Sequence, residues 1–138
     1  MEKETAYVLL QKGRELLEDG NPAQAAFVLE RARSREPNKG SILEMLGMAY
    51  YGYCRYRDAA RSFEEALEVD PTNDYAHYCL GLCFLKLDRR SEAGGHFKLA
   101  WYLRPYEMYR GKAVRFGASC GPAPEHVANG YGADDKEG

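Results

Sequence analysis

The sequence predicts an all-α protein made of repeated helical hairpins, and two observations carry this prediction. The 138-residue chain has only eight β-branched residues but 31 alanines and leucines. Because strands use β-branched side chains to fill their pleated faces, this composition argues strongly against a sheet-rich fold. The second observation is a repeat: Pro37, Pro71 and Pro105 stand 34 residues apart, and the segments between them carry apolar residues at helical spacing.

The repeat divides the chain into three copies without insertion or deletion, 6–39, 40–73 and 74–107. Each copy has two blocks of helical periodicity separated by a short polar stretch, which predicts helix A, a tight turn and helix B. A hairpin of this kind cannot bury its apolar face alone, so the copies should stack into a right-handed α-solenoid. When the copies are aligned, three more positions, or columns, hold the same residue in all three, at the same 34-residue step. These are Gly13, Gly47 and Gly81; Ala25, Ala59 and Ala93; and Ala32, Ala66 and Ala100.

The residue types explain where each helix begins, packs and ends. Asn21 and Pro22 are typical of an N-cap and a first helical residue. The glycine of helix A should let it press against the small alanine of helix B, as Gly81 against Ala93. The proline column ends each helix B because proline cannot donate the backbone bond.

The period fails after Pro105. Residues 106–116 could form one more helix that either caps the stack or covers its groove. Gly94 and Gly95, inside the third helix B, indicate close approach of another element or a local weakness. Residues 117–138 contain five glycines and two prolines, so we expect a domain of residues 1–116 and a disordered tail at 117–138 whose removal leaves helicity unchanged.

The repeated columns resemble the tetratricopeptide repeat, whose signature is Trp, Leu, Gly, Tyr, Ala, Phe, Ala, Pro. The resemblance covers about 100 residues and implies a superhelix whose A helices line a concave groove, often closed by a final solvating helix. Copy two matches it with Leu43, Leu46, Gly47, Tyr50, Ala59, Phe63, Ala66 and Pro71. Copy three has His77, Leu80, Gly81, Phe84, Ala93, Phe97, Ala100 and Pro105. Copy one is weaker, with Leu9, Lys12, Gly13, Leu16, Ala25, Leu29, Ala32 and Pro37.

Composition argues against several classes of partner. The 19 basic and 21 acidic residues nearly balance, so no global field favours nucleic acid or an anionic membrane. No apolar run approaches the roughly 20 residues that span a bilayer. The N-terminus lacks an apolar leader and the four cysteines form no Cys-x-x-Cys pair, so we expect a cytoplasmic protein with free thiols.

Catalytic chemistry finds little support, so we expect no enzyme, no cofactor and no metal. No Ser, Cys or Asp is spaced with a histidine to form a triad. His77, Cys79 and Cys83 could in principle ligate a soft metal, since the sulfur atoms of Cys79 and Cys83 lie about one helical turn apart. Packing is the favoured role of Cys83, because a buried cysteine behaves as a small hydrophobe. A metal- or thiol-dependent role of Cys79 and Cys83 stays an alternative.

The groove implied by the resemblance is the candidate site. If each repeat glycine faces helix B, the opposite side of each helix A faces away from it, and that side is largely apolar or aromatic. Such surfaces suit peptide binding, so we expect a non-catalytic module that binds a segment of another protein. Two other interpretations stay open: these side chains pack within the fold, or they form the interface between chains of a homo-oligomer. The predicted contacts are Arg14, Met45, Met48, Tyr51, Tyr75, Tyr78 and Leu82.

One known mode of the family is not matched. Heat-shock co-chaperones of this family grip acidic C-termini with a clamp of Lys, Asn, Asn, Lys and Arg. The corresponding residues here are Leu10, Arg14, Met45, Tyr75 and Cys79, of which only Arg14 is cationic. The apolar groove is similar instead to that of small chaperones of bacterial secretion systems.

Overall fold

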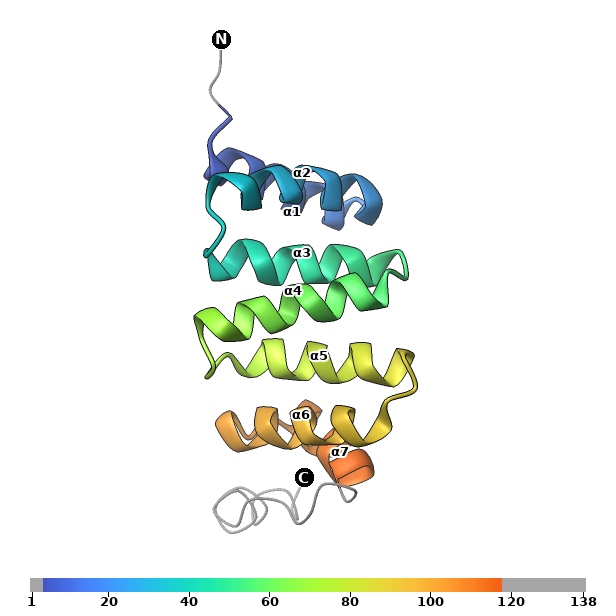
Figure 1. The fold of residues 1–138 in the computed structure, drawn as a ribbon. Coiled ribbons are helices and arrows are strands. Elements are labelled where there is room, and N and C mark those ends of the chain that lie inside the picture. Colours follow the sequence, from blue (N-terminus) through green and yellow to red (C-terminus); the bar gives the residue numbers. More distant parts are fainter. Residues whose placement is uncertain (1–3, 118–138) are drawn as a thin grey trace. The chain divides into compact units, whose positions relative to one another are not determined.

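The computed structural model describes residues 4–117 and contains, in that range, seven α-helices and no strand (Figure 1). The predicted all-α class is therefore confirmed. Six helices form three hairpins: α1 (Ala6–Glu18) with α2 (Pro22–Arg35), α3 (Gly40–Gly52) with α4 (Tyr56–Val69), and α5 (Asp74–Lys86) with α6 (Arg90–Leu103). A last helix, α7 (Glu107–Phe116), follows Pro105 and confirms the helix predicted at 106–116. Within residues 4–117, no helix combines the length and the apolar content needed to cross a membrane.

The helices keep the register of the repeat. The A helices begin at Ala6, Gly40 and Asp74, which are 34 residues apart, and the B helices begin with the same step. Asn21 and Pro22 are the N-cap and first residue of α2, as predicted, although the Asn21 side chain makes no capping hydrogen bond.

Each hairpin turn contains one residue in the left-handed region, again at a 34-residue step. Gly20 has φ +79°, whereas the equivalent Cys54 and Asp88 have φ +70° and +61°. Glycine adopts this conformation freely, and aspartate tolerates it, but a cysteine side chain does so at a cost of about 1 kcal/mol or more. The turn between α3 and α4 is therefore strained.

Replacing Cys54 with asparagine should relieve that strain. Asparagine visits the left-handed region more readily than cysteine and, unlike glycine, adds little freedom to the unfolded chain. We expect the free energy of unfolding to rise by about 0.5 kcal/mol, measured by urea denaturation. A Cys54→Val variant should lower it, because β-branched residues fit this region worst.

The chain divides into two compact units, one ending at Pro71 and the other beginning at Thr72, and each is described by itself. The single domain predicted for residues 1–116 therefore stays a prediction. In the first unit α1–α4 enclose an apolar core, at whose centre several side chains are fully buried. These are Leu29, Ile42, Leu46, Ala25, Ala32 and Ala49.

The alanines that the sequence suggested are not the nearest neighbours of the repeat glycines. A Cβ atom at Gly47 would lie 2.7 Å from Cζ of Phe63, and one at Gly81 would lie 2.5 Å from Cε1 of Phe97. The nearest atoms thus belong to the aromatic residue one turn after the alanine, rather than to Ala59 or Ala93. The glycine leaves the space that this ring fills.

In the second unit, α7 packs on α6 and also reaches α5. Tyr109 and Ala113 of α7 are buried, and Phe116 lies 5.8 Å from the Phe97 ring of α6, measured between ring centroids. A Cβ atom at Gly94 would overlap the carbonyl oxygen of Phe116. Close approach of the C-terminal segment is therefore the reason for glycine at position 94.

The predicted tail at 117–138 lies outside the described residues, apart from its first residue. Gly117 is the C-cap of α7 and is buried beside the aliphatic part of Lys98. The packed part of the chain therefore extends at least one residue beyond the predicted boundary.

Candidate interaction site on the A helices

Four of the seven predicted contact residues lie in the first unit. Arg14, on α1, is exposed, whereas Met45, Met48 and Tyr51, on α3, are partly buried. Met45 packs against the core of this unit, so part of its side chain serves the fold. Tyr51 meets the ring of Tyr56 edge-on at 5.2 Å between centroids. Met48 and Arg14 are therefore the residues of this set without a described packing role.

The other three residues, Tyr75, Tyr78 and Leu82, lie on α5 in the second unit. Tyr75 is 38 % exposed and Leu82 is partly buried. Tyr78 has the Phe97 ring of α6 at 5.8 Å and the Tyr109 ring of α7 at 5.1 Å. Burial raises the pKa of the Tyr78 phenol. Tyr78 is thus mainly a packing residue, while Tyr75, whose ring lies 6.3 Å from that of Tyr78 between centroids, is the more exposed of the two.

Helix α7 is held to α5 by a polar contact that the sequence did not reveal. The Tyr109 hydroxyl donates a 2.6 Å hydrogen bond to Asp74, and Arg104 lies 3.7 Å from the same carboxylate. Burial, followed by this hydrogen bond and the negative charge of Asp74, raises the pKa of Tyr109. Tyr109 stands 34 residues after Tyr75, but Ser41 occupies the same position of the second repeat, so the repeat gave no clear signal for this contact.

The positions that correspond to the family's carboxylate clamp lack most of its residue types, and some of them are also buried. Leu10 is 7 % exposed and Cys79 is 6 % exposed. A carboxylate could therefore reach Arg14 but not these two positions, which argues against recognition of an acidic C-terminus by the family's known clamp.

The residues of the alternative metal site, His77, Cys79 and Cys83, are not arranged as a metal site would need. Cys79 and Cys83 are buried with free thiols, and the Nδ1 atom of His77 lies 3.1 Å from Nδ1 of His96 on α6. Across the part of the chain that the structure describes, no group of three or more His, Cys, Asp or Glu side chains could hold a metal ion.

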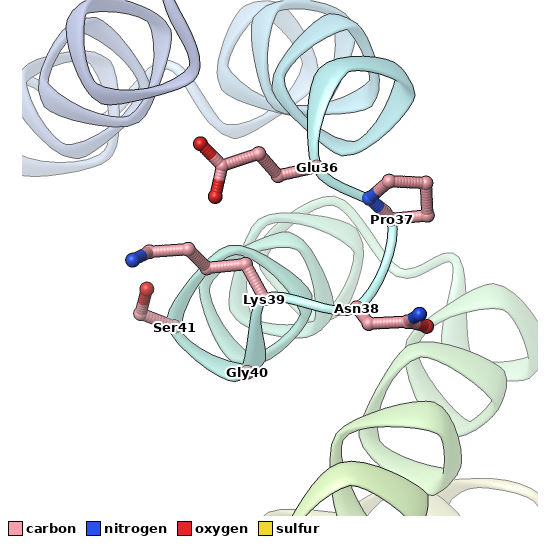
Figure 2. Close-up of a pocket in the computed structure, with 6 residues that line it drawn as sticks. All are labelled: Glu36, Pro37, Asn38, Lys39, Gly40 and Ser41. Carbon is pink, nitrogen blue, oxygen red and sulfur yellow. The ribbon is translucent and has the colours of Figure 1, made fainter.

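A hollow of about 570 Å³ lies at the loop between α2 and α3 (Figure 2). In Figure 2 the side chains of Glu36 and Lys39 point to the same side of the loop and that of Asn38 to the other. Opposite charges on one open surface select neither an anion nor a cation, so the hollow does not add to the candidate site. Its lining is Glu36, Pro37, Asn38, Lys39, Gly40 and Ser41.

Comparisons with known families agree with the fold and its repeat. Three models described as tetratricopeptide repeat match residues 10–52, 41–73 and 62–94. Together they span residues 10–94, more than half of the chain. The protein is thus an all-α array of helical hairpins, and it belongs to the tetratricopeptide repeat family. A comparison with curated protein sequences found no match.

Solved structures with a similar fold include domains determined with peptides. The first TPR of Spaghetti (RPAP3), bound to the HSP90 peptide SRMEEVD, is 15 % identical with a TM-score of 0.79, covering 88 % of this chain and 98 % of that one. YrrB, a TPR protein with an unusual peptide-binding site, is 22 % identical with a TM-score of 0.76, covering 82 % and 58 %.

The type III secretion chaperone SycD of Yersinia enterocolitica, in complex with a peptide of the translocator YopD, is 16 % identical with a TM-score of 0.70. The match covers 80 % of this chain and 86 % of SycD. At these identities, each likeness shows the fold alone.

Proposed function

We propose that this chain is a non-catalytic protein-interaction module that binds a segment of a partner protein through side chains of its A helices. The observation that carries the proposal is the exposure of aromatic side chains on these helices. Tyr75 is 38 % exposed although it is aromatic, and Tyr7 at the same position of the first repeat is 68 % exposed. Solvent alone does not favour aromatic rings at such positions, whereas protein interfaces are enriched in tyrosine and methionine.

The similar solved structures support the same function, because RPAP3 and SycD were determined with peptides of partner proteins. The chemistry of the partner segment should differ from that of an acidic C-terminus. Arg14 is the only cation among the predicted contacts, and the remaining contacts are Met45, Met48, Tyr51, Tyr75, Tyr78 and Leu82. We expect an apolar segment, bound in a reducing compartment such as the cytoplasm.

A paired substitution, Met48→Glu with Tyr75→Glu, tests this function. Tyr75 is exposed and Met48 is only partly buried, so neither belongs to the buried core and the variant should keep its helical circular dichroism spectrum. Truncating an aromatic anchor can cost 2 kcal/mol or more in binding, so we expect at least a tenfold loss of the proteins that the parent captures from its host. Quantitative mass spectrometry of the captured proteins is the measurement. Tyr78 is avoided because it packs against Phe97 and Tyr109.

The matched control reverses charge on a B helix, with Arg57→Glu and Arg61→Glu on α4. Both arginines are exposed, so this variant should capture the same proteins as the parent. Equal capture by all three proteins would refute the role of the A helices. Self-assembly is the competing function, and light scattering distinguishes it: a fall in mass with the A-helix pair would show that the partner is a second copy.

A further inference from the structure

Two histidines face each other inside the third hairpin. The Nδ1 atoms of His77, on α5, and His96, on α6, are 3.1 Å apart, with ring planes inclined by 25° and ring centroids 5.3 Å apart. The centroid separation is nearly the Nδ1···Nδ1 distance plus the two ring radii. Both nitrogens therefore lie on the line that joins the rings, and the imidazoles meet edge to edge in the geometry of an N–H···N hydrogen bond.

The first two hairpins use other side chains at the same two positions. The 34-residue step relates His77 and His96 to Leu9 and Val28 in the first hairpin, where both are buried. In the second hairpin the equivalents are Leu43 and Ser62, also buried. The positions thus belong to the interior of a hairpin, and apolar side chains can fill them. Only the third hairpin places two titratable rings there.

We propose that His77 and His96 form an acid-sensitive latch that closes the α5–α6 hairpin at neutral pH and weakens it when both rings are protonated. The hydrogen bond needs a proton on one Nδ1 and a lone pair on the other, so the two neutral rings adopt opposite tautomers. One added proton can bind Nε2 of the donor ring without breaking the Nδ1–H···Nδ1 bond. A second would set N–H against N–H and place two positive charges in contact.

The surroundings of the pair favour the neutral state. Burial, and then the charge of His77, lowers the pKa of His96 to about 4, against a partly opposing effect of Glu92 on the same helix. Glu92 gives limited help because Arg89 binds it at 2.6 Å. The guanidinium of Arg89 also lies 4.5 Å from the centroid of the Phe84 ring, which itself is 5.6 Å from His96. Glu92 and Arg89 are thus a carboxylate and a competing cation near His96.

The direction of the pH dependence follows from the lowered pKa. In the unfolded state the pKa of a histidine is 6.5, whereas in the folded state the pKa of His96 is about 4. Between these values the unfolded state holds more protons than the folded state, so stability falls as pH falls. Above pH 6.5 the latch contributes fully.

Imidazole nitrogen chemical shifts of the full chain test the tautomers directly. His126→Asn leaves only His77 and His96 to observe. At pH 7 we expect one ring with its proton on Nδ1 and the other with its proton on Nε2. Two rings protonated on Nε2, or two rings that both titrate near pH 6.5, would overturn the proposal.

The matched variant gives the third hairpin the pair of the first, with His77→Leu and His96→Val. Urea unfolding is followed by the fluorescence of Trp101, the single tryptophan, which is buried in α6. As the pH is lowered from 7 to 5, the unfolding equilibrium constant should rise more steeply for the parent than for the variant. The extra rise should be up to tenfold for each pH unit. If the unfolding constants of the two proteins depend identically on pH, the proposed latch is refuted, even if the two stabilities differ at pH 7.

Discussion

Replacing Gly81 with leucine should lower the free energy of unfolding by about 3 kcal/mol, the upper part of the range for overpacked cores. A Cβ atom at this position would lie 2.5 Å from Cε1 and 2.8 Å from Cδ1 of Phe97, far inside van der Waals contact. The Phe97 ring is fully buried and also contacts Tyr78 and Phe116. It therefore has little room to move, and either the ring or helix α5 must shift.

The measurement is urea unfolding followed by Trp101 fluorescence and by circular dichroism. Gly111→Leu is the matched control, because a Cβ atom at Gly111 would meet nothing within 4 Å. That substitution should be neutral or stabilising, since leucine favours helix over glycine by up to about 1 kcal/mol. Equal unfolding midpoints for Gly81→Leu and the parent would show that α5 and α6 do not pack as described.

Most of the fold could be predicted because a repeat constrains many residues at once. Three copies with the same step fix the helix boundaries: the turn residues Gly20, Cys54 and Asp88 all occupy one left-handed position, although their side chains differ. Taken one copy at a time, only the first would have shown a glycine in its turn. The second and third copies have Cys54 and Asp88 at that position. Spacing alone therefore predicted the helices and turns, whereas the left-handed turn residues were found only in the structure.

The partners of individual side chains were less predictable. Spacing placed Gly81 on the face of α5 that meets α6, but it could not decide between Ala93 and Phe97, which are one turn apart on the same face of α6. The choice depends on the exact offset of the two helices. The same limit hid the His77–His96 pair, because residues 19 apart in sequence meet only when the hairpin closes.

The candidate site could be predicted as a set of positions but not as a surface. Periodicity predicted which residues of each helix A turn away from helix B; of these, Tyr75 is exposed, whereas Tyr78 packs against Phe97 of helix B. It could not show that Tyr109 packs on Tyr78, since the repeat columns stop at Pro105 and α7 lies beyond them. Which aromatic rings remain open therefore depended on a segment outside the repeat.

Replacing Gly94 with alanine is the second substitution with a large expected effect. Its Cβ atom would overlap the carbonyl oxygen of Phe116 and lie 2.7 Å from the carbonyl carbon. These are backbone atoms, so no side-chain rotation relieves the overlap and α7 itself must move away from α6. Such a shift exposes Tyr109 and Ala113, which are 1 % and 4 % exposed, and strains the hydrogen bond from Tyr109 to Asp74.

We therefore expect Gly94→Ala to release α7 while the α5–α6 hairpin stays folded, with a loss of about 1–3 kcal/mol in the unfolding free energy of the second unit. Hydrogen exchange of residues 107–116 should accelerate, whereas exchange in residues 74–86 should change little. Gly111→Ala, on α7 itself, provides the comparison, since it adds the same methyl group in open space and should slow exchange of α7. Unchanged protection of α7 in Gly94→Ala would contradict the close approach, and glycine at position 94 would then have no packing role.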